Sequence, residues 1–277
     1  MGMNFGRFAR GFGPIMAIGL AAALAGCDKA NVSFDGDKGK PLEELDLTGA
    51  APTGVALIGP DTVRITRGDK LAIKVDGDPE TASSIRFTLK DGRLGILRKE
   101  GNWGRDKTVA VNVTLPALSE IAAMGSGSVS ADRIGGKASV SIGGSGSVET
   151  TTVEAESLEV SIAGSGSYRG AGQARALELS IAGSGSAEMD GLKADSAEVS
   201  IAGSGNARFA SDGKVKASMV GSGEVRMKGR ATCTVSAVGS GKLVCENGAT
   251  EEDAAPPTPP SPPTPPPAPQ PPAPEKT

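Results

Sequence analysis

The sequence predicts an all-β chain whose body is a β-solenoid, a single-stranded right-handed parallel β-helix with coils of about 18–20 residues. The first indication is the tripeptide Gly-Ser-Gly, which occurs seven times. The copies begin at Gly125, Gly144, Gly164, Gly183, Gly203, Gly221 and Gly239. A nearly constant period of about 20 residues is typical of a solenoid, in which each repeat forms one coil that stacks on its neighbours.

The segment before each Gly-Ser-Gly is the second indication. Residues 157–163 read Ser-Leu-Glu-Val-Ser-Ile-Ala, and this alternation predicts a strand with one buried face. Aligning the repeats gives an inward column of Ile142, Ile162, Ile181, Ile201, Met219 and Ala237. A second inward column follows the turn, with Val129, Val148, Tyr168, Ala187, Ala207, Val225 and Leu243. The glycines are expected to supply the positive φ angles at which each strand bends into the next.

Residues 1–27 are expected to form a lipoprotein signal peptide. Arg7 and Arg10 give a basic start, and the apolar stretch of residues 15–25 is shorter than the ~20 residues of a membrane span. The stretch ends in Leu-Ala-Gly-Cys, which resembles the bacterial lipobox, in which the cysteine, here Cys27, is acylated and becomes the first residue of the mature chain. The alternative is an ordinary cleavage site with an incidental cysteine.

Asp28 directly follows this cysteine. In enterobacterial lipoproteins, an aspartate at this position resembles the signal for retention in the inner membrane. We therefore expect an extracytoplasmic protein that is lipid-anchored to a bacterial membrane and faces the periplasm, with the inner membrane favoured. Residues 28–47 are polar and acidic and contain glycine and proline, so they are expected to form a flexible tether.

Residues 48–248 are expected to form a single β-solenoid domain. Its first part contains short strand-like runs at 54–58, 62–66, 71–75, 85–89, 94–97 and 109–115. Turn sequences such as Gly59-Pro60-Asp61 and Asp91-Gly92 separate these runs. No convincing helical pattern is present, and we expect these strands to cover the N-terminal end of the solenoid.

The order of these motifs resembles the GIN head-domain family over residues 48–247. The resemblance rests on Gly59-Pro60, on Val-Arg-Ile-Thr-Arg-Gly-Asp at 63–69, and on Val-Thr-Leu-Pro-Ala-Leu at 113–118, which runs into the Gly-Ser-Gly repeats. Members are bacterial, often lipoproteins, and are labelled as head domains of autotransporter adhesins. The resemblance implies a β-helical fold and a role in adhesion or surface interaction, and it brings no catalytic residues.

Two further cysteines lie in the last coils. Cys233 and Cys245 continue inward columns on adjacent coils, across a narrow core. In an oxidising compartment such a pair suggests a disulfide that closes the end of the solenoid. The alternative is a pair of buried thiols that act as small core residues. A metal site is not expected, because two thiolates have no histidine or further cysteine to complete a tetrahedral set.

Three glutamates, Glu159, Glu178 and Glu198, occupy one outward column on successive coils. The serines Ser161, Ser180 and Ser200 form the column beside them, and both columns are taken as a candidate binding face. Stacked strands are ~4.8 Å apart, so the like charges repel one another, and a divalent cation or a basic partner would relieve that repulsion. The alternative is a solvated face whose side chains splay apart.

Composition argues against several functional classes. The chain of 277 residues has no histidine and a net charge of −3. Histidine is the usual general base and the commonest metal ligand, so its absence lowers the expectation of an enzyme or a metal centre, and no cofactor is expected. The mild acidity, without a cluster of Lys and Arg, argues against nucleic acid as a partner.

Residues 249–277 are expected to form a disordered proline-rich tail that serves as a spacer or as a ligand for a proline-binding groove. The leading function is a non-enzymatic, membrane-anchored envelope lipoprotein with an adhesin-like interaction domain, whose partner is an envelope protein or polysaccharide. The alternative is a structural envelope or cell-wall protein that acts through the tail. A third hypothesis is a carbohydrate-active enzyme. It requires a groove in which two carboxylates, or a carboxylate and an Arg or Lys, lie close together.

Overall fold

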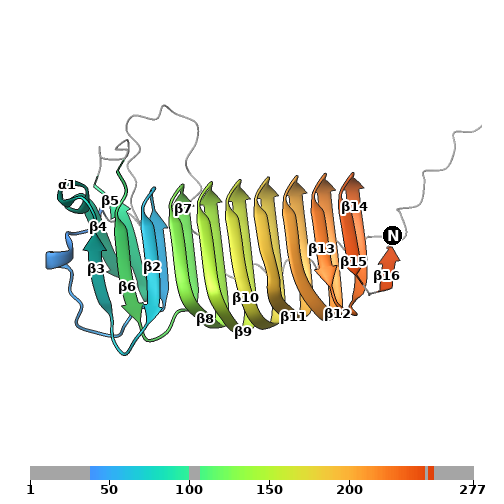
Figure 1. Cartoon of the computed structure of the whole chain (residues 1–277), viewed down its shortest axis with the longest axis horizontal. Coiled ribbons are helices and arrows are strands. Elements are labelled where there is room, and N and C mark those ends of the chain that lie inside the picture. Colours follow the sequence, from blue (N-terminus) through green and yellow to red (C-terminus); the bar gives the residue numbers. More distant parts are fainter. Residues whose placement is uncertain (1–37, 100–106, 247–248, 253–277) are drawn as a thin grey trace, which may run out of the picture.

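The chain folds into the predicted β-solenoid, in which stacked coils are joined as parallel strands of one sheet (Figure 1). The computed structural model describes residues 38–99, 107–246 and 249–252. The expected signal peptide with Cys27, residues 28–37 of the tether and residues 253–277 of the tail lie outside the described residues.

The regular part of the solenoid is made of long strands that each run round most of one coil. These are β8 (Ser128–Gly144), β9 (Ser147–Gly164), β10 (Ser167–Gly183), β11 (Ser186–Gly203) and β12 (Asn206–Gly221). The last coils are divided into β13 (Glu224–Lys228), β14 (Thr232–Gly239), β15 (Lys242–Glu246) and β16 (Ala249–Glu252). Each coil pairs with the next in parallel, so that equivalent repeat positions lie side by side.

The Gly-Ser-Gly turns stack directly on one another. The first glycine of every copy has a φ angle between 103° and 124°, a region that L-amino acids with a side chain rarely adopt. Its carbonyl accepts a hydrogen bond from the serine N–H of the next coil, as in the 2.9 Å bond from Ser145 to Gly125. From Gly144 onward, a Cβ at this position would come closer than 3.0 Å to the carbonyl oxygen of the preceding glycine. Glycine is therefore required both by the backbone angle and by the close stacking.

The predicted inward columns form the core. Five members of the first column lie side by side on successive strands, and each is 2 % exposed: Ile142, Ile162, Ile181, Ile201 and Met219. The sixth member, Ala237, is exposed, contrary to its predicted burial, because β16 pairs only with residues 232–235 of β14 and leaves the rest of that strand uncovered.

The N-terminal strands agree with the prediction in position, but their spatial order could not be read from the sequence. They are β1 (Gly54–Ile58), β2 (Thr62–Arg67), β3 (Ala72–Asp76), β4 (Ile85–Lys90), β5 (Arg93–Arg98), β6 (Ala110–Leu115) and β7 (Glu120–Gly125). β1 lies between β5 and β7, and β2 lies between β6 and β8, so the coil that comes first in the sequence is second in space. The turn at Gly59 is stacked beneath the Gly-Ser-Gly column, and its carbonyl accepts the N–H of Gly127 at 2.9 Å.

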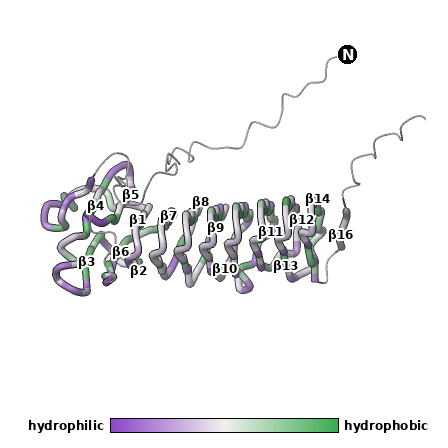
Figure 2. Tube along the Cα trace, turned by 90° about the horizontal axis from the view of Figure 1, so that it is seen from above, coloured by the Kyte–Doolittle hydropathy of each residue, from purple (hydrophilic) through white to green (hydrophobic). Residues whose placement is uncertain are grey.

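Antiparallel strands and two short helical turns close the N-terminal end. β3 pairs with β6 and β4 pairs with β5, both antiparallel. The turn α1 (Pro79–Ala82) is capped by Asp78, which accepts the Thr81 N–H, and η1 (Leu42–Glu44) packs Leu42 against the core. The sequence did not predict either turn, because four residues are too few to show a helical period. Hydrophilic loops are concentrated at this end (Figure 2).

A buried ion pair joins the first turn to the end of β5. The Arg98 guanidinium donates to both carboxylate oxygens of Asp61, at 2.8 and 2.6 Å, and both side chains are at most 1 % exposed. Asp61 also accepts the Val109 N–H at 3.0 Å, and Arg98 donates to the Lys107 carbonyl at 2.8 Å. These bonds connect residues 107–109, which directly precede β6, to the turn that follows β1.

We predict that Asp61→Asn lowers the free energy of unfolding by about 3 kcal/mol, because it leaves the Arg98 guanidinium buried against a neutral amide. Denaturant unfolding measures the loss. The double variant Asp61→Leu/Arg98→Met removes both charges and is expected to be more stable than the single variant. Equal stability of Asp61→Asn and the unmodified chain would contradict the assignment.

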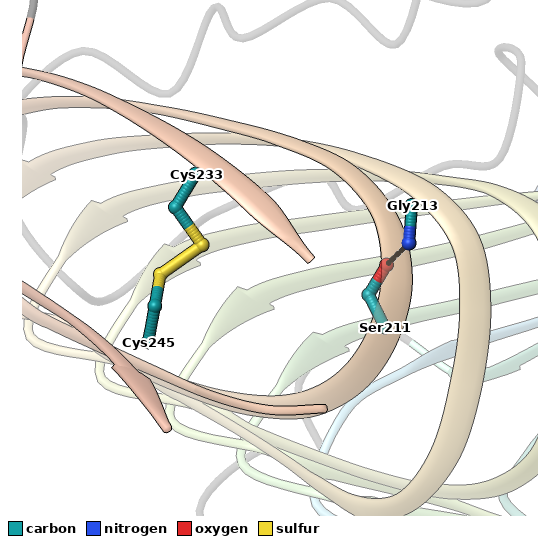
Figure 3. The surroundings of a disulfide bond; sticks show 4 residues. All are labelled: Ser211, Gly213, Cys233 and Cys245. Atoms are coloured by element: carbon teal, nitrogen blue, oxygen red, sulfur yellow. Dashed lines mark hydrogen bonds between the residues drawn. A yellow bond between two sulfur atoms is a disulfide. The ribbon is translucent and has the colours of Figure 1, made fainter. Parts of the chain in front are cut away.

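The last coils are joined covalently. Cys233 on β14 and Cys245 on β15 form a disulfide across the coil interior, with their Cα atoms 6.8 Å apart (Figure 3). The two residues are 12 positions apart in the sequence, so the bond closes a short loop that contains the turn at Gly239. It holds together the coil that has no complete neighbour on its outer side.

We predict that replacing both cysteines with alanine lowers the free energy of opening of the last coils by about 3 kcal/mol, because a loop of this length gains that conformational entropy when it is released. Hydrogen exchange of the amides in β14 and β15 measures the change. Protection in β8 and β9 serves as the internal control, since coils couple mainly to their nearest neighbours. A uniform loss of protection along the chain would argue against a local role.

Candidate functional site

The candidate site is a flat outward surface on β9, β10 and β11, formed by the segments that precede the Gly-Ser-Gly turns. We call it the ladder face. It consists of three rows, which are Glu159, Glu178 and Glu198, then Ser161, Ser180 and Ser200, then Ala163, Ala182 and Ala202. Each row aligns residue for residue across the three strands, as the sequence alignment predicted.

The regular geometry of the ladder face follows from the fold beneath it. Alternate residues of each strand point into the core, where Val160, Leu179 and Val199 are fully buried, so the residues between them point to solvent. Serine and alanine are short, and the strands stay at a spacing of ~4.8 Å, so the surface is flat and repeats at that interval. An extended molecule lying along the solenoid axis would meet the same three groups at each coil.

The glutamate row carries charge that its surroundings do not neutralise. Partial desolvation by its neighbours, and then the carboxylates of Glu159 and Glu198, raise the pKa of the exposed Glu178 above its usual value. None of the three glutamates takes part in an ion pair with any residue that the structure describes. The charge of Glu178 is therefore disfavoured by its two neighbours, and a positive group beside it would offset this effect.

Charge compensation begins at both ends of this row. On the N-terminal side the same column contains Ser139 and then Glu120, which is paired with Arg93 at 2.8 Å. On the C-terminal side Lys216 is in register with Glu198, and Lys214 is in register with Ser196. Residues 214–221 keep one unbroken register with residues 196–203, so both lysines lie on this surface at positions that the Gly-Ser-Gly period implies.

The glutamates and these lysines surround a hollow of about 350 Å³ on the ladder face. It brings together the three carboxylates with Lys214 and Lys216. The hypothesis of a carbohydrate-active enzyme required such a combination of carboxylates with a basic residue. The walls of the hollow, however, are side chains of one continuous sheet, and no loop among the described residues is inserted between these strands. No cluster of three or more metal-ligating side chains occurs in the part of the chain that the structure describes.

Charged residues in other outward columns form ion pairs. Arg169 pairs with Glu188 of the next coil at 2.9 Å, whereas Arg226 pairs with Glu224 of its own strand at 2.6 Å. Opposite charges in register stabilise neighbouring strands, whereas like charges destabilise them. The glutamate row differs from this arrangement because its members have the same sign on three successive coils.

The fold and this surface define a class of protein, a β-solenoid that displays a flat repeating face. The chain belongs to the family described as "Putative auto-transporter adhesin, head GIN domain", whose sequence profile matches residues 51–231. The match confirms the resemblance seen in the sequence. None of the curated proteins matches the chain.

Solved structures with the same fold come from Bacteroides and Parabacteroides species. The chain is similar to a "putative adhesin" from Bacteroides fragilis, with a TM-score of 0.61 and 20% identity over 73% of this chain and 93% of that one. A "putative lipid binding protein" from Parabacteroides distasonis gives 0.57 and 21%, over 71% and 93%. A "putative adhesin" from Parabacteroides merdae gives 0.56 and 19%, over 72% and 93%. At this level of identity the likeness shows the shared fold.

Membrane attachment is not visible in the described part of the chain. Among residues 38–99, 107–246 and 249–252, no helix is long and apolar enough to cross a bilayer. The family points to an envelope or extracellular protein, as the sequence led us to expect.

We predict that Glu178→Gln raises the free energy of unfolding at pH 7 by about 0.5 kcal/mol, as expected for removing a like charge between two strand neighbours. The folded state binds a proton at Glu178 more readily than the unfolded chain, because the pKa of Glu178 is raised. The free energy of unfolding of the unmodified chain therefore decreases as the pH rises through that raised pKa. The Glu178→Gln variant has no carboxyl at this position and does not show this decrease. Below the unfolded pKa of about 4.3 the two proteins are expected to converge.

Thermal unfolding at pH 3 and pH 7 in low salt measures this difference. Glu149→Gln is the matched control, because Glu149 is in register with Arg169 and its neutralisation removes an attraction. An equal gain in both variants would show that the repulsion in the glutamate row is not the cause.

Proposed function

We propose that the chain is a non-enzymatic, lipid-anchored envelope protein that binds an extended, positively charged partner on the ladder face. The carrying observation is the row of Glu159, Glu178 and Glu198, which repeats at strand spacing without compensating ion pairs among the described residues. A partner with basic groups along an extended backbone would relieve this repulsion, and the flat serine and alanine rows would let it approach closely. An envelope protein segment or an amino-bearing polysaccharide has this chemistry.

The envelope location is supported by the sequence of the first 47 residues and by the family. The Leu-Ala-Gly-Cys27 motif supports acylation, Asp28 favours the inner membrane, and residues 28–47 have the composition of a tether. In this proposal the residues before Lys40 hold the solenoid away from the membrane surface, since Lys40 and Leu42 themselves contact the solenoid. The ladder face is then free to meet components of the cell envelope.

The enzyme alternative has weaker support. The hollow at Glu178 contains carboxylates and lysines, but it lies on an open sheet that does not exclude water or enclose a substrate. Seven serines in equivalent turn positions, in a chain without histidine, do not supply a single activated nucleophile.

We predict that the purified full-length acylated chain retains a partner from solubilised envelopes of its own organism, and that Glu159→Lys/Glu178→Lys/Glu198→Lys reduces this retention at least ~10-fold, because it reverses the charge opposite the partner. The matched control reverses Glu149, Glu156 and Asp195, which are exposed side chains on other columns. It makes the same change in net charge and is expected to retain the partner.

Two further samples separate the alternatives. Deletion of residues 254–277 is expected to leave retention unchanged, whereas its loss there would favour the structural role of the tail. Incubation with envelope polysaccharide tests for new chain ends, and their appearance would favour the enzyme. Equal recovery with both charge-reversal variants would contradict binding at the ladder face.

A further inference from the structure

The C-terminal end of the solenoid is an open sheet edge. β15 pairs with β13 on one side, and no described residue pairs with it on the other side. Among the described strands, residues 236–239 of β14 likewise pair only with β12. Unpaired N–H and C=O groups along such an edge are a template for another strand.

The two ends of the molecule differ in this respect. At the N-terminal end, β4 and β3 add antiparallel strands, and the Lys40 and Phe87 backbones exchange hydrogen bonds of 2.8 Å that cover β4 in turn. At the C-terminal end the inward-facing Ala237 is exposed, and Leu243 and Cys245 are only half-buried. The apolar interior of the last coil therefore reaches the surface.

The chain that follows β16 is poorly suited to close this edge. Residues 256–273 are mostly proline, and proline has no N–H to donate to a strand ladder. The edge groups of β15 hydrogen-bond to water unless a strand from elsewhere pairs with them.

The sequence of β15 is complementary to itself in the antiparallel direction. β15 reads Lys-Leu-Val-Cys-Glu, with Lys242, Val244 and Glu246 in outward columns and Leu243 and Cys245 facing the core. If two copies pair about a two-fold axis at Val244, Lys242 of each lies opposite Glu246 of the other. Leu243 then lies opposite Cys245, so charge meets charge on the outside and apolar meets apolar on the inside.

We propose that two copies of this chain associate end to end through β15, with Val244 on the two-fold axis. The contact is isologous, so it closes at a dimer and leaves the capped N-terminal ends outermost. The two-fold axis at Val244 is perpendicular to the sheet surface of β15 and passes through the interior of the last coil. The open interiors of the last coils of the two copies therefore lie against each other. The dimer would present two ladder faces on one continuous solenoid.

The first test places a cysteine on the proposed axis. Val244→Cys in the full chain is expected to form a covalent dimer under mild oxidation or with a short bis-maleimide, because its thiol lies opposite its own copy. Arg226→Cys is the matched control, since Arg226 is exposed in the same column one coil inward. Cross-linking of Val244→Cys alone supports the proposal, and equal yields from the two variants would overturn it.

The second test exchanges the charges. Lys242→Glu and Glu246→Lys each place like charges opposite one another and are expected to weaken self-association at least ~10-fold in sedimentation velocity. The double variant Lys242→Glu/Glu246→Lys restores opposite charges across the axis and is expected to return within about threefold of the unmodified chain.

The double variant also distinguishes pairing from damage to the fold. Lys242 lies in register with Glu224, so its reversal disturbs a neighbour within the same chain, and the double variant keeps that disturbance. Recovery in the double variant therefore supports pairing between copies. A chain that stays monomeric at ~100 μM, or a double variant as weak as the single ones, would overturn the proposal.

Discussion

The hydrogen bond between stacked Gly-Ser-Gly turns is the constraint on which the rest of the structure depends. Each serine N–H reaches the carbonyl of the first glycine of the preceding coil at 2.9 Å, a contact that leaves no space for a Cβ. Because the turns stack without offset, the strands between them share one register. A side chain at one of these glycines would meet both a disfavoured φ angle and a backbone carbonyl, so each turn ties two coils together.

This shared register has opposite consequences inside and outside the coil. Inside, like stacks on like, and each fully buried Val, Leu or Ile contributes about 1.5–3 kcal/mol of hydrophobic stabilisation. Outside, the same rule places Glu178 between Glu159 and Glu198, at a cost of a few tenths of a kcal/mol per neighbour. The core gain is several times larger than the surface cost, so the fold can carry a row of like charges on its surface.

The ends of the solenoid need other interactions, because a terminal coil has a neighbour on only one side. At the N-terminal end, the buried Asp61–Arg98 pair and the antiparallel strands β3 and β4 supply them. At the C-terminal end, the Cys233–Cys245 disulfide holds the last turn, while the edge of β15 is left without a partner among the described residues. The two ends therefore differ in their capacity to pair with another strand, because only the C-terminal end has an edge without a partner among the described residues.

The sequence by itself determined the repeat. Gly-Ser-Gly spacing, period-two alternation and the inward columns from Val129 to Leu243 were sufficient to predict the coils, because each coil repeats local chemistry and contacts only its neighbours. It also identified the members of the glutamate row, whose alignment follows from the same period. The order of β1 between β5 and β7 and the ion pair of Asp61 with Arg98 were decided by tertiary structure. Both depend on contacts between segments far apart in the chain, which leave no periodic signal in the sequence.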